Sequence, residues 1–159
     1  MKNLLTLKNG LIVFSIIFLA AQLIRIDKIN YTQTTSSDIF QVLDASTSVQ
    51  EIIKTACYDC HSNQVKYPWY SEVAPISWWL SDHISEARSE LNFSEWRKYD
   101  TKKASHKLEE CFEQVARENM PLPSYTWIHR DANLTEGQRV KLVAWFKQSK
   151  RAIQADNPQ

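Results

Sequence analysis

The chain begins with one long apolar run and continues with segments whose apolar residues recur at helical spacing. Apolar residues fill almost every position from Leu11 to Ile24, and basic residues flank the run on both sides. The run is short for a membrane-spanning helix, which needs about 20 apolar residues, yet its length suits a secretory signal. Residues 1–26 are therefore predicted to be a signal anchor or a signal peptide, with the uncleaved anchor favoured.

A polar stretch rich in serine and threonine follows the apolar run. Residues 27–45 contain the sequence YTQTTSSD and are predicted to form a polar linker between a membrane and a folded domain. The folded domain is expected over residues 46–150. The remaining residues, 151–159, end in QADNPQ and are predicted to be a disordered tail.

Four segments of the domain have the apolar spacing of amphipathic helices. The first begins with a capping-box pattern at Ser48 and runs into Cys57, the second begins at Pro75, the third is capped by Asp100, and the last begins with a second capping box at Thr135. Their apolar stripes are Val49, Ile52, Ile53 and Ala56; Ile76, Trp79, Leu80, His83, Ile84, Ala87 and Leu91; Ala104, Leu108, Cys111, Phe112 and Val115; and Val140, Leu142, Val143, Trp145 and Phe146. No segment alternates as a strand does, so the predicted fold class is all-α with four to five helices.

Charge and glycine content exclude two classes of partner. The 19 basic and 18 acidic side chains give a net charge of +1 without a long run of one sign, so nucleic acid is not an expected partner. Only two glycines occur, which argues against a glycine-rich loop that binds phosphates.

The chemistry of the chain is concentrated in the sequence Cys57-Tyr-Asp-Cys60-His61. Two thiols at this spacing, followed directly by a histidine, are typical of covalent haem attachment. The thiols reach the two vinyl groups of one porphyrin, and the next residue lies where its imidazole binds the iron. The other imidazole nitrogen then needs a hydrogen-bond acceptor, and a carbonyl in the ring-rich loop after His61 is the expected one.

Three other interpretations of the motif are weaker. A redox-active dithiol belongs in a βαβ setting, whereas this domain is predicted to be helical. A zinc site needs a second pair of ligands, and Cys111, His83, His106 and His129 are too scattered to supply one. Two plain buried cysteines would leave the adjacent histidine unexplained. An export segment upstream favours haem, because this attachment takes place outside the cytoplasm.

A haem iron that carries electrons needs a second axial ligand, and Met120 is the predicted one. It lies in the proline-bounded loop Met120-Pro-Leu-Pro123, which limits where the side chain can point. His83, on the apolar stripe of its helix, is the alternative ligand. The predicted iron ligands are therefore His61 and Met120, and the cofactor-binding residues are Cys57, Cys60, His61 and Met120.

Other polar and aromatic residues are expected to support the haem. The six tryptophans are predicted to pack the core and wall the cofactor, and Tyr125 and Trp127 are the predicted partners of its propionates. His129 is expected to have a structural role, with a bond to a propionate as the alternative. Cys111 lies on an apolar stripe and is expected to be an inert core thiol.

Two blocks of sequence resemble the small haem-binding domain family of bacterial proteins. They are CYDCHSNQVKYPWYSEVAPISWWLSDHISEARSELNFSEW, from Cys57, and ENMPLPSYTWIHRDANLTEGQRVKLVAWF, which ends at Phe146. The resemblance implies one haem c on Cys57, Cys60 and His61 in an exported protein, sometimes associated with cytochrome c peroxidase modules.

The sequence therefore predicts a monohaem c-type cytochrome that transfers single electrons and is not an enzyme. Its helices are expected to surround one iron-containing haem c, held by two thioethers, in a cytochrome c-like arrangement. The expected location is the bacterial inner membrane, with a single N-terminal span and the haem domain in the periplasm. The expected partners are redox proteins of the envelope, such as peroxidase-like or respiratory enzymes. The alternative is a haem-based sensor or a peroxidase-associated domain with a labile sixth ligand, for which Glu118 and His129 are the nearest acid–base residues.

Overall fold

The computed structural model describes residues 2–28, 30 and 34–156, and these contain α-helices and short 3-10 helices but no strand. The all-α prediction is confirmed. The α-helices are α1 (Lys2–Ala21), α2 (Thr47–Ala56), α3 (Tyr58–His61), α4 (Ile76–Glu90), α5 (Thr101–Ala116), α6 (Pro123–Thr126) and α7 (Glu136–Asp156). The 3-10 helices are η1 (Ile39–Gln41), η2 (Trp69–Glu72), η3 (Phe93–Lys98) and η4 (Arg130–Ala132).

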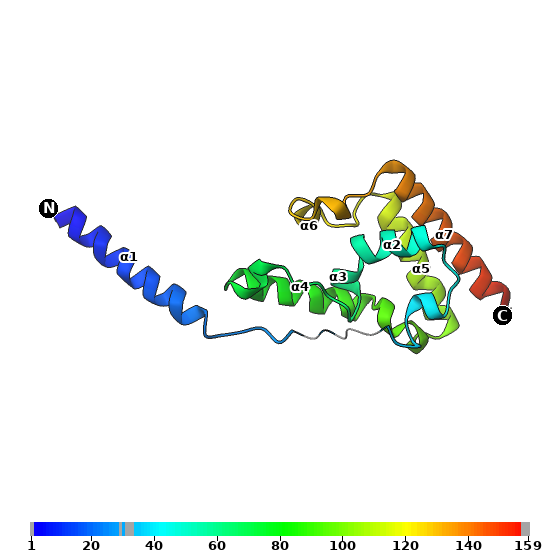
Figure 1. The fold of residues 1–159 in the computed structure, drawn as a ribbon, viewed down its shortest axis with the longest axis horizontal. Helices are drawn as coiled ribbons and strands as arrows, with labels where there is room; N and C mark the ends of the chain where they lie inside the picture. Colours follow the sequence, from blue (N-terminus) through cyan, green and yellow to red (C-terminus); the bar gives the residue numbers. More distant parts are fainter. Residues whose placement is uncertain (1, 29, 31–33, 157–159) are drawn as a thin grey trace.

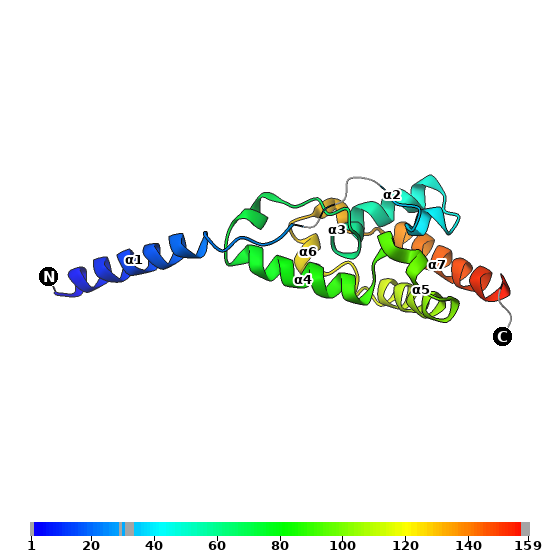
Figure 2. The same ribbon diagram turned by 90° about the horizontal axis from the view of Figure 1, so that it is seen from below.

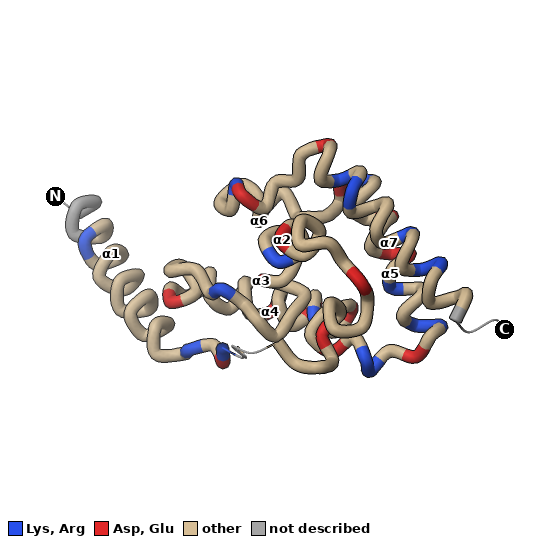
Figure 3. Tube along the Cα trace, turned by 45° about the vertical axis from the view of Figure 1, so that its right-hand side comes forward, with Lys and Arg blue, Asp and Glu red and all other residues tan. Residues whose placement is uncertain are grey.

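The N-terminal helix α1 extends away from the other helices (Figure 1). Among the described residues, no helix has the length and apolarity that crossing a membrane requires, so the predicted membrane span is not supported. The apolar part of α1 is short: from Leu11 to Ala21 it is roughly 16 Å long at about 1.5 Å per residue. The hydrocarbon core of a bilayer is about 30 Å thick. Figure 3 shows that the middle of α1 carries no charged residue, whereas charged residues of both signs are distributed along α5 and α7.

The segment after α1 is tied to the helical domain by side-chain contacts. The Gln22 side chain pairs with the backbone of Ala74 through two hydrogen bonds of 2.9 and 3.2 Å. Trp78 Nε1 donates to Ile24 O at 2.9 Å, and Lys28 forms an ion pair with Glu72. The end of the predicted signal segment and the start of the predicted linker therefore lie against η2 and the start of α4.

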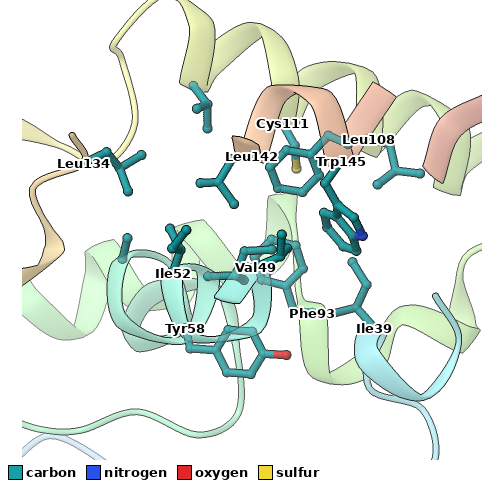
Figure 4. Packing of buried hydrophobic residues seen from close by; sticks show 14 of the residues in the cluster. Ile39, Val49, Ile52, Tyr58, Phe93, Leu108, Cys111, Leu134, Leu142 and Trp145 are labelled. Atoms are coloured by element: carbon teal, nitrogen blue, oxygen red, sulfur yellow. The ribbon is translucent and has the colours of Figure 1, made fainter. Parts of the chain in front are cut away.

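The main core lies between α2, η3, α5 and α7. The two long helices α5 and α7 pack against each other and run side by side in Figures 1 and 2. Figure 4 shows its side chains meeting from these elements around Phe93 and Leu142, which are 1% and 0% exposed. Burying such side chains supplies the main stabilisation of a domain of this size. The predicted stripe of α2 is buried at every position.

Two helix starts follow the sequence prediction and one does not. Asp100 caps α5 by accepting from Lys103 N at 2.7 Å. Thr135 and Gln138 form the reciprocal contacts of a capping box, at 2.8 and 3.3 Å. In contrast, α2 begins at Thr47, so Ser48 lies inside the helix and caps nothing.

The boundaries of the folded domain are wider than expected. Asp38 and Ile39, in the predicted linker, are both 0% exposed, so the fold begins before residue 46. At the other end, α7 continues to Asp156, and Ile153 packs against the main core. The predicted tail is thus helical over residues 151–156, while residues 157–159 lie outside the described part.

Candidate functional site

The motif from Cys57 to His61 forms a separate helical turn. The backbone of Cys57 (φ −127°, ψ −35°) departs from helical geometry, which ends α2 and starts α3. His61 N donates to Cys57 O at 2.9 Å, and Cys60 N donates to the same oxygen at 3.2 Å. Because residues four apart share one side of a helical turn, Cys57 and His61 face the same way. The sequence predicted the helix before the motif but not this break.

A cavity of about 320 Å³ lies beside this turn, within the size range of sites that bind small molecules and cofactors. Its wall is mainly apolar. Cys57, His61 and Met120, three of the four predicted cofactor-binding residues, line it together. The other lining residues are Ala56, Glu90, Leu91, Phe93, Lys107, Glu110, Cys111, Gln114, Val115, Pro121, Leu134 and Phe146.

The imidazole of His61 is oriented by the end of α4. Its Nδ1 lies 3.1 Å from the carbonyl oxygens of both Ala87 and Leu91. Carbonyl oxygens only accept hydrogen bonds, so Nδ1 carries the hydrogen and Nε2 keeps its lone pair. The acceptor is a carbonyl, as expected, but it comes from α4 and not from the ring-rich loop.

Burial keeps His61 neutral. It lowers the pKa of the imidazole, and the two backbone hydrogen bonds only partly oppose this effect. A neutral imidazole with a free Nε2 lone pair is the form that binds a metal. The ring of Phe93 meets the imidazole edge-on, with ring centroids 6.2 Å apart, and stacks on Tyr58 at 5.7 Å. These aromatic contacts restrict the rotation of the imidazole.

Met120 and His83, the two predicted sixth ligands, lie in different surroundings. Met120 is partly buried in the loop between α5 and α6 and lines the cavity with His61. His83 is not among the lining residues. Its Nδ1 lies 2.9 Å from Trp79 O, and its ring contacts the Trp79 indole at a tilt of 42°, with ring centroids 4.1 Å apart. The structure therefore brings Met120, and not His83, to the cavity of His61.

The three cysteines lie in apolar surroundings. Burial, and then the neighbouring Cys60, raises the pKa of the Cys57 thiol to about 12. Burial, and then Asp59, raises the pKa of Cys60 to about 11. Cys60 is not among the lining residues. Cys111 lines the cavity, and burial raises its pKa, so its thiol stays protonated at neutral pH.

Three charged residues of the cavity wall were missed by the sequence analysis. Among the described residues that line the cavity, Lys107 is the one lysine or arginine, and its side chain is 11% exposed. Its Nζ lies 2.7 Å from Glu110 and 3.6 Å from Glu90. Burial opposes the charge of Lys107, but the two carboxylates outweigh this and raise its pKa. The i, i+3 spacing of Lys107 and Glu110 indicates an ion pair on one helix face. It does not indicate that this ion pair lies in the cavity wall.

The predicted propionate partners lie outside the cavity wall. Tyr125 OH donates to Asp59 Oδ2 at 2.7 Å, His129 Nε2 lies 2.7 Å from Tyr70 OH, and Trp127 is 79% exposed. None of the six tryptophans lines the cavity, so the expected indole wall is wrong. Leucine, valine and phenylalanine form it instead, and they come from the end of α4, from η3, from α5, from α7 and from the segment before α7.

The donors of this site fit haem c. A neutral imidazole and a thioether share one apolar cavity, and two thiols lie in the adjoining turn, which are the groups that bind haem iron and vinyl carbons. Zinc fits less well, since no group of three or more His, Cys, Asp or Glu side chains in the described part of the chain is arranged around a metal position.

Comparison with known proteins identifies the family. The model of a family described as a haem-binding domain matches residues 16–148. Neither the curated proteins nor the solved structures contain a match. The matched segment includes the cysteine–histidine turn, the cavity and the Met120 loop. The chain therefore belongs to the haem-binding domain family.

Proposed function

We propose that this protein is a monohaem c-type cytochrome that transfers single electrons in the bacterial cell envelope. In this proposal, Cys57 and Cys60 form thioethers with the haem, and His61 and Met120 bind its iron. The observation that carries the proposal is the shared cavity of His61 and Met120, with Nε2 of His61 left free by the hydrogen bonds of Nδ1. When bound, the haem supplies the one-electron change between Fe(III) and Fe(II).

The residues of the chain set the conditions of that electron change. His61 stays neutral and fixed in orientation, because α4 accepts its Nδ1 hydrogen. Met120, as the second residue holding the iron, would raise the reduction potential of the haem. The apolar wall, including Leu91, Phe93 and Phe146, excludes water and disfavours the additional charge of Fe(III). The positive charge of Lys107 also favours Fe(II), whereas the carboxylates of Glu90 and Glu110 in the same wall favour Fe(III).

The sensor or peroxidase alternative has less support from the site. It needs an acid–base group beside an open iron position, and Glu118 and His129 were the predicted groups. Neither is among the lining residues, and His129 is already bonded to Tyr70. Carrier function needs no such group, so the carrier is the function that the geometry favours.

We also propose an envelope location. Haem is attached to cysteine pairs outside the cytoplasm, so the protein must be exported. The apolar helix α1, with exposed Phe14, Ile17 and Leu19, is the segment suited to an export signal. The proposed partners are respiratory enzymes or cytochrome c peroxidase-like proteins that exchange electrons with the haem.

Covalent attachment is tested by haem staining of a denaturing gel. The protein is produced in a bacterium that attaches haem c, and the wild type is expected to keep its stain after denaturation. The double variant Cys57→Ala/Cys60→Ala is expected to lose it, while Cys111→Ala keeps it. An unstained wild-type band, with the protein present in the exported fraction, contradicts the proposal.

A further inference from the structure

The loop that carries Met120 is anchored at its start to the end of α5. Met120 N and Asn119 N both donate to Gln114 O, at 3.3 and 3.0 Å. The side chain of Asn119 adds a bond from Nδ2 to Gln114 Oε1 at 2.9 Å. These contacts fix the beginning of the loop but leave its continuation toward α6 to be fixed by other residues.

The continuation of the loop is bonded directly to the cysteine–histidine turn. Tyr125, in α6, donates its hydroxyl to Asp59 Oδ2 at 2.7 Å. Asp59 lies between Cys57 and Cys60, and its Oδ1 accepts from Lys66 N at 2.9 Å. Hydrogen bonds to a charged acceptor are among the stronger ones in proteins. This bond therefore ties the segment that follows Met120 to the turn that carries His61.

A second set of contacts holds the Tyr125 ring in place. The ring stacks on His129 with centroids 4.3 Å apart and planes 14° apart. His129 Nε2 in turn lies 2.7 Å from the hydroxyl of Tyr70, whose side chain is 8% exposed. Tyr70 packs with Val65, Leu80 and Ile84 in a second small core that involves α4. Asp59, Tyr125, His129 and Tyr70 thus form one connected row, called here the Tyr125 latch.

We propose that Tyr125 is a positioning residue that holds Met120 at the iron. This proposal rests on the proposed function, since it requires Met120 to be the sixth ligand. Movement of the Met120 loop away from the cavity would withdraw the thioether from the iron. With the latch intact, that movement is limited at Gln114 on one side and at Asp59 on the other. Loss of the Tyr125–Asp59 bond frees one end and makes the sixth position more accessible.

The test uses carbon monoxide binding to the reduced holoprotein, because this ligand must replace Met120. In Tyr125→Phe, binding is expected to be about tenfold faster than in the wild type, on the scale of one lost hydrogen bond to a charged group. The matched control is Thr126→Val, which removes a hydroxyl from the same helix α6 that donates only to Leu122 O at 3.4 Å and Pro123 O at 3.3 Å. Its binding rate is expected to stay within about twofold of the wild type, as for a change outside the site.

A second variant separates positioning from general loosening of the fold. Asp59→Asn removes the charged acceptor, and its binding rate should rise in the same direction as that of Tyr125→Phe. The double variant Tyr125→Phe/Asp59→Asn should then bind carbon monoxide no faster than the faster of the two single variants, because both substitutions weaken the same hydrogen bond. Additive effects of the two changes contradict a shared role of Tyr125 and Asp59.

Failure of this proposal is distinguishable from failure of the proposed function. The oxidised wild type should show the weak far-red absorption band of a methionine–iron bond. If that band is present and Tyr125→Phe binds carbon monoxide at the wild-type rate, the positioning role is wrong. If the band is absent from the wild type, Met120 is not the ligand and both proposals fail at that point.

Discussion

The Nδ1 atom of His61 lies 3.1 Å from the carbonyl oxygen of Leu91, the residue that ends α4. This contact joins the imidazole of the cysteine–histidine turn to a helix terminus, where carbonyl oxygens have no partner within the helix. The partial negative charge at that terminus stabilises the Nδ1–H group. The orientation of the imidazole is therefore built into the fold.

Replacing His61 is expected to remove the proximal iron ligand without removing the haem. In His61→Ala, the two thioethers persist, and the visible spectrum changes to that of a haem lacking a strong axial nitrogen. Added imidazole should restore the wild-type spectrum, because the cavity and the carbonyls of α4 remain. His83→Ala is the control and should keep the wild-type spectrum. An unchanged spectrum in His61→Ala contradicts the ligand assignment.

Phe93 is expected to be the most costly single aromatic position near the site. It is 1% exposed and contacts Tyr58, His61 and Trp96. Phe93→Ala should lower the free energy of unfolding by about 3–5 kcal/mol, because it leaves a cavity. Urea unfolding measures this loss. Trp69→Ala, at a side chain 79% exposed, should cost less than about 0.5 kcal/mol.

Asp38 should make stability depend on pH. Burial raises its pKa above the ordinary value of 3.8, against the hydrogen bonds from Phe40 N and Tyr58 OH. The folded state thus binds this proton more tightly than the unfolded state. The resulting stabilisation is fully present below pH 3.8 and is lost as pH rises through the folded-state pKa.

Asp38→Asn removes this titration and serves as the comparison. As pH rises from 3.8, the free energy of unfolding of the wild type should fall relative to that of Asp38→Asn. The shift should be roughly 1.4 kcal/mol for each unit by which the pKa is raised. Urea unfolding at a series of pH values measures it, and parallel curves for the two proteins contradict the role of Asp38.

Lys107 should tune the haem potential. It is the lysine of the cavity wall, so its charge favours Fe(II) over the more positive Fe(III). Lys107→Gln should lower the reduction potential by about 40 mV, which corresponds to on the order of 1 kcal/mol for one electron. Redox titration measures the change. Lys141→Gln, on the exposed face of α7, is the control, and an equal change in both variants contradicts a local effect.

The regular helices could be predicted from the sequence because their signals are local. The stripe of α2 and the caps at Asp100 and Thr135 each depend on residues a few positions apart. The α4 stripe was only partly correct. Leu80 and Ile84 are buried, but Ile76 and Trp79 are 47% and 49% exposed, because only the small second core covers this helix.

The remaining features depend on contacts between distant segments. The four-residue helix α6 has too few residues to be stable by itself, and the Tyr125–Asp59 bond helps to hold it. The acceptor for His61 comes from the end of α4, and Lys107 reaches the cavity only through the packing of α5. No residue spacing in the sequence predicts these contacts between distant segments. The sequence singled out Cys57, His61 and Met120, which line one cavity, whereas the residues that support them could not be predicted.

The oxidised visible spectrum of the holoprotein, with and without Met120, tests the central claim most directly. The wild type should show the weak far-red band of a methionine–iron bond, and Met120→Ala should lose that band and bind carbon monoxide at once when reduced. His83→Ala should keep the band. A wild type without the band, or a Met120→Ala protein with an unchanged spectrum, would contradict the assignment of His61 and Met120 as the two axial ligands.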